Sequence, residues 1–380
     1  MRQVDQATRR LEEALAEGVA TAMACVAIVD GRKKHWSYHG RIEVDGLDEP
    51  VGPDTLFDLA SLTKVMATTT MISSIHGTGG LDLDAPVHRL LPELSEDGRR
   101  VLTVRDLLAH RSGLPAHAEW WRAASVDPRS THLFRLPERQ PTGDGRRLPV
   151  ASAREATREA VLSTPLERKP RTKAVYSDAG FILLGILLER LTRRPLHTLF
   201  GVEIARPLGL ASTRFVDEAA PLARAIEVAP TRRAPSRGGG LLVGQVDDDN
   251  AYALGGVAGH AGLFGTAEDV ASFGQATLEA WEGQRRGPLQ PECARVFLRR
   301  DPTPGSTRAL GWDTPSSRGS AAGKIMSKNQ AVGHLGYTGC SLWIDRSRRM
   351  VIALLTNRIH CSADPAPIRR LRSEVHDLLA

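Results

Sequence analysis

The chain has 380 residues, of which 41% are hydrophobic and 25% charged, and its formal net charge is +6. These proportions are typical of a globular protein with a buried core, and the length leaves room for two or three units of ~150 residues. The positive charge comes mostly from arginines spread along the chain, without the basic stripe and interleaved aromatic residues of a nucleic-acid-binding surface. Nucleic acid is therefore not expected as a partner.

The cysteines are too scattered to indicate a metal site. There are four of them, and they form no Cys-x-x-Cys pair or other metal-ligand spacing. Free and mostly buried thiols are expected, which suits a reducing compartment. They are Cys25, Cys293, Cys340 and Cys361.

The N-terminal segment, MRQVDQATRRLEEALAEG, is acidic and amphipathic and has no basic region followed by an apolar core. The apolar stretch at residues 20–29 is too short to span a bilayer, which takes about 20 residues. The sequence therefore predicts a cytoplasmic protein without a membrane span, or a periplasmic one if the start codon is misassigned.

The start of the chain carries the pattern of a helix followed by a hairpin. Apolar residues recur at helical spacing over residues 4–17. Strands are expected over 22–29 and 34–42, because Asp30-Gly31 between them is a strong hairpin signal.

The end of the chain mirrors this order. Strands are expected over 340–344 and 350–355, joined by the polar residues 345–349. A closing helix follows, and its apolar positions are Ile368, Leu371, Val375 and Leu378.

The middle of the chain reads as helices and loops. Thr103-x-x-Asp106 and Thr266-x-x-Asp269 each predict a helix that begins with a capping box. The segment FILLGILLERL, residues 181–191, has the composition of a buried helix.

The arrangement of these elements predicts an α+β fold. One antiparallel sheet built from both chain ends is packed with helices, and a mostly helical part is inserted between them. The expected domains are 1–85 together with 236–380, and an inserted helical domain at 86–235. Residues 116–149 have little apolar periodicity and are expected to form a long surface excursion.

The clearest catalytic candidate is the pair Ser61 and Lys64 in FDLASLTKVMATTTMI, the only Ser-x-x-Lys of the chain. At positions i and i+3 of a helix capped by Asp58, both side chains project from the same face. A serine in the first turn gains a backbone N–H and the positive end of the helix dipole, and a neutral lysine can take its proton. The alternative is a surface serine and lysine on an ordinary amphipathic helix.

Two further segments carry candidate residues. In KAVYSDAGFILLG, Tyr176 precedes a helix that Ser177 or Asp178 is expected to cap, so that the phenol can reach into a cleft. The run VGHLGYTGCSLWID, residues 332–345, has glycines that let the backbone approach a ligand at a sheet edge. The alternatives are a packed tyrosine beside a helix cap and a tight turn between strands.

In this order and spacing, the three segments resemble the penicillin-recognising serine hydrolases, and most closely the class C β-lactamase-related branch that also holds esterases and D,D-carboxypeptidases. The stretches LLAHRSGLP (107–115) and GGVAGHAGLFGTAEDVASF (255–273) match that branch too. The resemblance covers residues 15–378 and implies a β-lactamase/transpeptidase-like fold.

The resemblance also implies a division of roles. Ser61 attacks the acyl carbon, and Lys64 and Tyr176 share the proton transfer. The backbone N–H groups of Ser61 and Tyr337 hold the oxyanion, while Asp178 orients Lys64 and the substrate. No metal or organic cofactor is required.

Two departures from the family pattern bear on the substrate. Many relatives carry Asn where this chain has Asp178, and Lys-Thr-Gly where it has His334-Leu335-Gly336. An ionised Asp only accepts hydrogen bonds, and a histidine is mostly uncharged at neutral pH. Both changes weaken the binding of a substrate carboxylate that is expected of His334 and Gly336. His110, His117 and His260 lie in the matching stretches and are expected to be structural.

The function expected from the sequence is that of a serine hydrolase that acts on a small ester, amide or peptide-like substrate through a Ser61 acyl-enzyme. The alternative is a non-catalytic receptor or binding module on the same fold, which would need a damaged Ser61, Lys64 or Tyr176. The natural substrate and the oligomeric state stay open.

Overall fold

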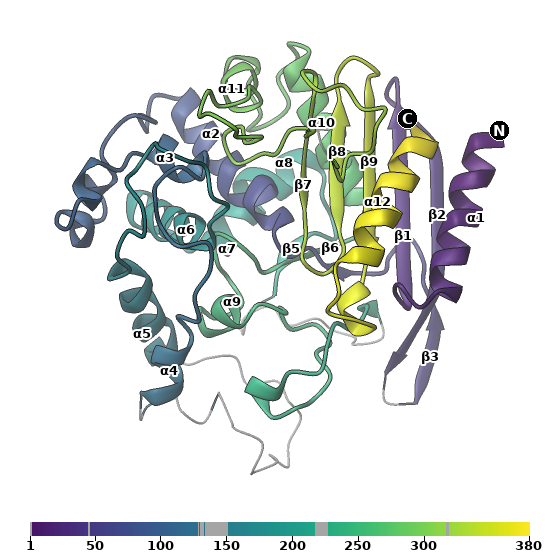
Figure 1. Cartoon of the computed structure of the whole chain (residues 1–380), viewed down its shortest axis with the longest axis horizontal. Coiled ribbons are helices and arrows are strands. Elements are labelled where there is room, and N and C mark those ends of the chain that lie inside the picture. Colours follow the sequence, from purple (N-terminus) through teal and green to yellow (C-terminus); the bar gives the residue numbers. More distant parts are fainter. Residues whose placement is uncertain are drawn as a thin grey trace.

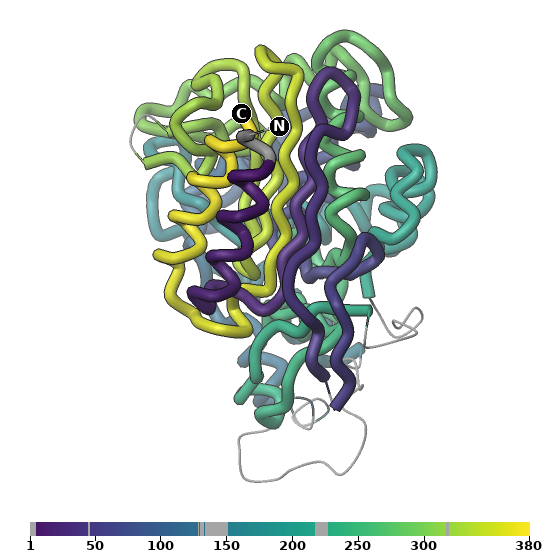
Figure 2. The backbone as a smooth tube through the Cα atoms, turned by 90° about the vertical axis from the view of Figure 1, so that its right-hand side faces the viewer, coloured from purple at the N-terminus to yellow at the C-terminus, as the bar shows by residue number. Residues whose placement is uncertain are grey.

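The computed structural model of the chain describes residues 2–44, 46–127, 129, 133, 151–216, 227–316 and 319–380. A sheet lies at one side of the molecule, and a mostly helical part lies beside it (Figure 1). Both termini lie on the sheet side, where the N-terminal and C-terminal helices run next to each other (Figure 2).

The main sheet is built from both ends of the chain, as expected. Its six strands are antiparallel and lie in the order β3-β2-β1-β9-β8-β7. The pairing of β1 with β9 joins the two ends. The strands are β1 (Ala22–Val29), β2 (Arg32–Val44), β3 (Leu47–Pro50), β7 (Ala331–Leu335), β8 (Ser341–Asp345) and β9 (Met350–Thr356).

The turn between β1 and β2 confirms the hairpin signal. Asp30 and Gly31 have φ angles of 50° and 70°. Positive φ at both central positions is what a two-residue type I′ turn requires, because its twist matches that of the flanking strands.

Side chains of β1 alternate between two hydrophobic clusters on the two faces of the sheet. Met23 and Cys25 belong to the cluster formed with α1 (Arg2–Ala16) and α12 (Ala366–Leu379), the expected terminal helices. Ala24 and Val26 belong to the cluster that includes α10 (Ala267–Trp281) on the opposite face. The terminal helices are also tied by an ion pair between Arg10 and Glu374 at 2.6 Å.

The close approach of α10 to the sheet depends on a glycine. A Cβ atom added at Gly274 would lie 2.4 Å from Cγ1 of Val351 on β9. Any larger side chain would therefore push the helix away from the strands that it covers.

The rest of the described chain is mostly helical, with one small sheet. This sheet has the order β4-β6-β5, and it consists of β4 (Phe57–Asp58), β5 (Arg214–Phe215) and β6 (Leu263–Gly265). The helices are α2 (Thr70–Gly77), α3 (Val104–Leu108), α4 (Arg122–Val126), α5 (Ala151–Leu162), α6 (Asp178–Thr192), α7 (Leu196–Leu199), α8 (Arg206–Leu208), α9 (Asp249–Ala253) and α11 (Pro291–Phe297), with π-helical segments at Lys64–Thr69 and Phe200–Ala205.

One hydrophobic core runs through both parts of the molecule. The same cluster of buried residues contains Val26 of the sheet, Ile72 of α2 and Leu184 of α6. The division into domains at residues 86 and 235 stays a prediction.

One of the two expected capping boxes is complete and the other is half formed. Thr103 and Asp106 satisfy each other's backbone N–H groups at the start of α3. Thr266 accepts the N–H of Asp269 at the start of α10. The Asp269 carboxylate instead accepts the backbone N–H groups of residues 212 and 213, both at 2.8 Å, in the segment that precedes β5.

Several other expectations can be compared with the described residues. All four cysteines are free, and Cys361 is the exposed one. None of the described helices has the length and apolar composition needed to cross a membrane. Most of the surface excursion expected at 116–149 lies outside the described residues.

Candidate active site

Ser61 follows β4 at a sharp bend in the backbone. The bend has a left-handed residue, Ala60, with φ of 46°, a conformation that costs free energy at a residue with a side chain. The carboxylate of Asp58 accepts the N–H of Ala60 at 2.8 Å and holds this bend. The expectation that Asp58 caps the following helix is therefore wrong, because its oxygens are used by Ala60 and by the N–H of Asp247.

Lys64 is fully buried, and its ammonium group has three partners. It donates to Oγ of Ser61 at 2.8 Å, to Oδ1 of Asp178 at 2.8 Å and to the carbonyl of His260 at 3.1 Å. Burial by itself would lower the pKa of Lys64, but Asp178 and Tyr176 raise it above its ordinary value. Lys64 is thus held as an ammonium ion, unlike the neutral base that the Ser-x-x-Lys spacing alone suggests.

Asp178 is the first residue of α6, and its side chain is not the helix cap. Ser177 caps the helix by accepting the N–H of Gly180, and its hydroxyl donates to the carbonyl of Pro115 at 2.6 Å. This division leaves both carboxylate oxygens of Asp178 free to face Lys64 and His117. Burial would raise the pKa of Asp178, but Lys64, His117 and His260 together outweigh it and hold that pKa far below its usual range.

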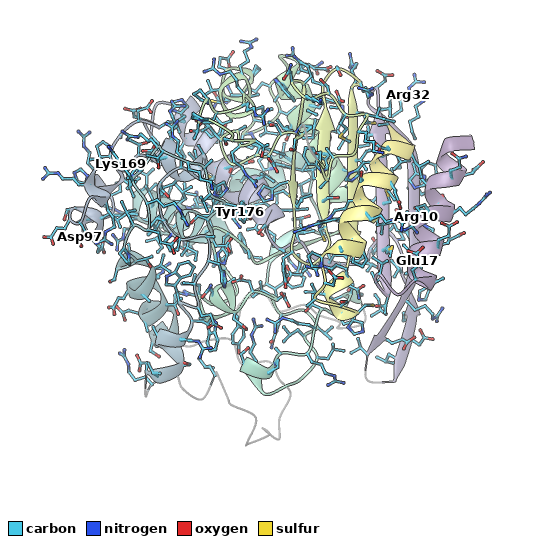
Figure 3. The ribbon with its side chains drawn as sticks, in the orientation of Figure 1. Arg10, Glu17, Arg32, Asp97, Lys169 and Tyr176 are labelled. Carbon is cyan, nitrogen blue, oxygen red and sulfur yellow. The ribbon has the colours of Figure 1, made fainter. Side chains whose placement is uncertain are left out.

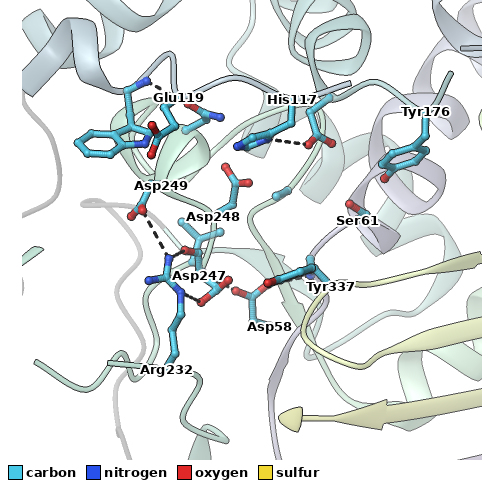
Figure 4. Close-up of a pocket in the computed structure, with 16 residues that line it drawn as sticks. Asp58, Ser61, His117, Glu119, Tyr176, Arg232, Asp247, Asp248, Asp249 and Tyr337 are labelled. Atoms are coloured by element: carbon cyan, nitrogen blue, oxygen red, sulfur yellow. Dashed lines mark hydrogen bonds and ion pairs between the residues drawn. The ribbon is translucent and has the colours of Figure 1, made fainter. Parts of the chain in front are cut away.

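Tyr176 lies between the helical part and the sheet, in contrast to the charged side chains that project from the surface (Figure 3). Its hydroxyl is buried, makes no hydrogen bond within the described part of the chain, and lies on the side of Ser61 (Figure 4). Nζ of Lys64 is 4.9 Å from the centre of its ring, and the guanidinium carbon of Arg308 is at 5.0 Å. Burial raises the pKa of Tyr176, and Lys64 only partly offsets this.

The turn between β7 and β8 is packed against the segment that carries Ser61. A Cβ atom added at Gly336 would lie 2.7 Å from the carbonyl oxygen of Leu59, so glycine permits this approach. The hydroxyl of Thr338 donates to the carbonyl of Asp58 at 2.7 Å.

The two backbone N–H groups expected to hold the oxyanion are available. Among the described residues, neither the N–H of Ser61 nor that of Tyr337 donates a hydrogen bond. The ring of Tyr337 is 58% exposed and lines the same cavity as Ser61. Paired N–H donors beside a nucleophile are suited to stabilising a tetrahedral oxyanion.

His334 and Gly336 are not placed in the cavity wall, although both were expected to bind substrate. His334 is buried behind Tyr176, with the two ring centres 5.8 Å apart. Burial, followed by Lys64 and Arg308, lowers its pKa well below the usual value, so the imidazole is uncharged. Gly336 has its carbonyl bound by Arg372 at 2.7 Å.

Ser61, Tyr176, Asp178 and Tyr337 line one cavity of about 620 Å³ (Figure 4). Its wall is acidic, because the residues that line it include six carboxylates and a single arginine, Arg232. The carboxylates belong to Asp58, Glu119, Asp178, Asp247, Asp248 and Asp249. Burial and the neighbouring Asp247 raise the pKa of Asp58 to about 7.

His117 lines the cavity, whereas a structural role was expected for it. Its Nδ1 lies 3.3 Å from Oδ2 of Asp178, and the side chain is 54% exposed. This hydrogen bond outweighs burial and raises the pKa of His117. His110 and His260 also touch the site, since His110 accepts the N–H of Ser177 and the His260 carbonyl binds Lys64. No local pattern marks these roles, which depend on contacts across 61 to 196 residues of sequence.

Comparison with known proteins identifies the family. The family model described as beta-lactamase matches residues 8–376. An N-acetylmuramyl-L-alanine amidase of Bacillus subtilis (strain 168) is 32% identical, covering 95% of this chain and 81% of its own. A putative D-alanyl-D-alanine carboxypeptidase of Salmonella gallinarum is 30% identical, covering 81% of this chain and 70% of its own.

Solved structures show the same fold. EstCE1, described as a hydrolase with promiscuous acyltransferase activity, superposes with a TM-score of 0.72 at 21% identity, covering 100% of this chain and 97% of its own. A class C beta-lactamase superposes with a TM-score of 0.70 at 15% identity, covering 99% and 95%. The chain belongs to the beta-lactamase family, which confirms both the resemblance and the α+β, β-lactamase/transpeptidase-like fold class.

Proposed function

We propose that this serine hydrolase of the beta-lactamase family cleaves an ester or amide bond through an acyl-enzyme on Ser61. The observation that carries the proposal is the position of the Lys64 ammonium, which donates at 2.8 Å both to Oγ of Ser61 and to Asp178. Relatives named as an amidase and as putative carboxypeptidases support the proposal.

The protonation states argue for Tyr176 as the group that receives the serine proton. Lys64 already holds three hydrogen-bond acceptors as an ammonium ion and has no lone pair for a proton. Its positive charge near the Tyr176 ring favours the phenolate, which is the basic form of the tyrosine. Since burial keeps the pKa of Tyr176 raised, kcat/KM is expected to rise towards high pH.

The proposed reaction follows from these positions. As the bond between Ser61 Oγ and the acyl carbon forms, the hydroxyl proton passes to the Tyr176 phenolate. The N–H groups of Ser61 and Tyr337 bind the oxyanion. Tyr176 then returns the proton to the leaving oxygen or nitrogen as its bond to the acyl carbon breaks. Water repeats the sequence and releases the acid.

Labelling with a fluorophosphonate probe tests the proposal against a binding module that does not react. We expect the probe to modify Ser61, with the labelled peptide identified by mass spectrometry. Ser61→Ala should be unlabelled, whereas Ser74→Ala, a control on the helix that follows, should label like the parent chain. Labelling at another residue, or none, would contradict the proposal.

The location in the cell is a separate matter. The cytoplasmic location expected from the N-terminal segment stays a prediction, and fractionation of cells that express the tagged chain tests it.

A further inference from the structure

The carboxylates of the cavity wall differ in how their charges are balanced. Asp178 is paired with the buried Lys64. Asp247 pairs with Arg232 at 2.8 Å, and Asp249 pairs with Arg237 at 2.7 Å and more distantly with Arg232 at 3.4 Å. The only arginine in the wall is therefore already used by two carboxylates.

Asp58 and Asp248 have no arginine or lysine partner within the described part of the chain. Asp58 accepts two backbone N–H groups, and Asp248 accepts the N–H of Ala251 at 2.7 Å and contacts Nε2 of His260 at 2.9 Å. Burial would raise the pKa of Asp248, but His260 and the Ala251 N–H lower it below its usual value. Asp248 is thus a carboxylate ion at the cavity, where its side chain is 26% exposed (Figure 4).

Glu119 adds to the negative charge at the rim. It is paired with Arg122 at 2.7 Å, but both side chains are at least half exposed. An exposed pair of this kind is screened by water and contributes little net attraction. Its charge remains partly available to a ligand at the mouth of the cavity.

Arg308 and His334, the groups suited to binding a substrate carboxylate, are occupied by other contacts. Arg308 lies over the Tyr176 ring and is 3.5 Å from Asp313. His334 is buried and uncharged. An anionic substrate would therefore meet carboxylates in this cavity without a free cation among the described residues that line it.

An observation independent of charge shows that the cavity is arranged for a ligand. The buried hydroxyl of Tyr176, which lines the cavity, has no hydrogen-bond partner among the described residues. Leaving a buried polar group unpaired costs free energy, which a bound substrate can recover.

We infer that the cavity selects substrates with a cationic group, such as a primary ammonium, on the part that lies against Asp248. The inference rests on the proposed function, because it assumes that the acyl bond is attacked at Ser61. It adds the class of substrate: an ester or amide whose acyl part carries a positive charge.

Three p-nitrophenyl esters of similar length test the inference: 6-aminohexanoate with an ammonium, heptanoate without charge, and the monoester of adipate with a carboxylate. At pH 7 and low salt, kcat/KM for the ammonium ester should exceed that for heptanoate by about tenfold, and the carboxylate ester should be slowest. Added salt should reduce the preference, because it screens the charges.

Asp248→Asn is the matched variant, since asparagine is also a good helix cap and preserves the start of α9. The ratio of the ammonium to the neutral ester should fall by several-fold. Glu12→Gln removes an exposed carboxylate on α1, away from the cavity, and should leave the ratio unchanged. If the variant does not fold, the salt series on the parent chain still tests whether charge causes the preference for the ammonium ester.

The outcomes separate this inference from the proposed function. If all three esters are cleaved and Ser61 is labelled, but kcat/KM shows no preference for the ammonium ester, the inference is wrong and the proposed function stands. If the parent chain cleaves none of the esters and Ser61 is not labelled, both are overturned.

Discussion

Two buried carboxylates of the same cavity, Asp178 and Asp58, have pKa values that are shifted in opposite directions. Burial acts to raise the pKa of both, yet the pKa of Asp178 is far below its usual range and that of Asp58 is raised to about 7. Asp178 faces the Lys64 ammonium at 2.8 Å, whereas Asp58 faces another carboxylate, Asp247. Because burial acts in the same direction on both groups, the neighbouring charge decides which carboxylate keeps its charge and which can take up a proton.

This difference in pKa marks two parts of the cavity: a reacting end around Ser61 and Asp178, and a charged wall that holds Asp58 and Asp248. At the reacting end, every charge is paired and Ser61 is aligned by Lys64. At the wall, Asp248 keeps its negative charge and Asp58 can take up a proton near neutral pH, and neither has an arginine or lysine partner in the described chain.

The largest effect is expected at the reacting end. Ser61→Ala should lower kcat for p-nitrophenyl butyrate by ~10⁴–10⁶ and leave the circular dichroism spectrum unchanged, because the side chain is a nucleophile and not a core residue. Steady-state kinetics with Ser74→Ala as the control measures this. Near-normal turnover by Ser61→Ala would place the nucleophile elsewhere.

The proton-transfer groups should be nearly as important. Lys64→Ala and Tyr176→Phe are each expected to reduce kcat almost as much as Ser61→Ala, because the three side chains act as a unit. Lys64→Ala also leaves Asp178 buried without its partner, so we expect a loss of stability of about 3–5 kcal/mol. A Tyr176→Phe protein with most of its activity would exclude the phenol as the proton carrier.

The difference in kcat/KM between classes of substrate should be smaller than the effects of these substitutions on kcat. Small activated esters are expected to be turned over faster than a chromogenic cephalosporin or a D-Ala-D-Ala peptide, by about tenfold to a hundredfold in kcat/KM. The reason is that both anionic substrates meet an acidic wall and a buried, uncharged His334. A higher kcat/KM for the cephalosporin than for p-nitrophenyl acetate or butyrate would contradict this.

Asp178→Asn should move the pH profile. The change removes the carboxylate that raises the pKa of Lys64 and of Tyr176, so both groups lose their protons at lower pH. The rise of kcat/KM with pH should therefore shift downward by about one unit. Ser177 caps the helix, so Asp178→Asn should not lower the melting temperature through a loss of capping.

An unmoved profile for Asp178→Asn would show that the carboxylate does not tune the proton transfer. The pH–rate profile and the melting temperature, measured on the same protein, separate an effect of Asp178 on proton transfer from an effect on stability.

The smallest expected effect is the contribution of Asp58 to the pH dependence of the protein's stability. Its pKa in the folded protein, about 7, lies above the ordinary value of 3.8, so the folded state holds this proton more tightly. The resulting stability is present below pH ~3.8 and is lost as the pH rises through about 7. Asp58→Asn should flatten the pH dependence of the melting temperature over that window by a few degrees.

The exposed Asp54→Asn serves as the control for Asp58, and only the slope is compared, since Asp58→Asn also disturbs a backbone hydrogen bond. An unchanged slope would mean that Asp58 titrates like an ordinary surface carboxylate.

Much of the architecture could be predicted because its signals are local. The Asp30-Gly31 turn between two expected strands predicted the hairpin at the start of the sheet, and period-3.6 patterns predicted the terminal helices. Thr103 and Asp106 formed a complete capping box because both groups lie within one turn. Asp269 did not complete a capping box, because its carboxylate accepts two backbone N–H groups from the segment before β5, far away in the sequence.

By itself, the sequence determined the pairing of Ser61 with Lys64, since three residues of helical chain are enough to bring the two side chains together. Only the tertiary structure decided the charge of that lysine, through a carboxylate 114 residues away at Asp178. It also moved His334 out of the cavity wall and brought His117 into it. Spacing along the chain fixes which neighbours meet within a turn, whereas burial and distant charges, which set protonation and the character of the wall, exist only once the chain has folded.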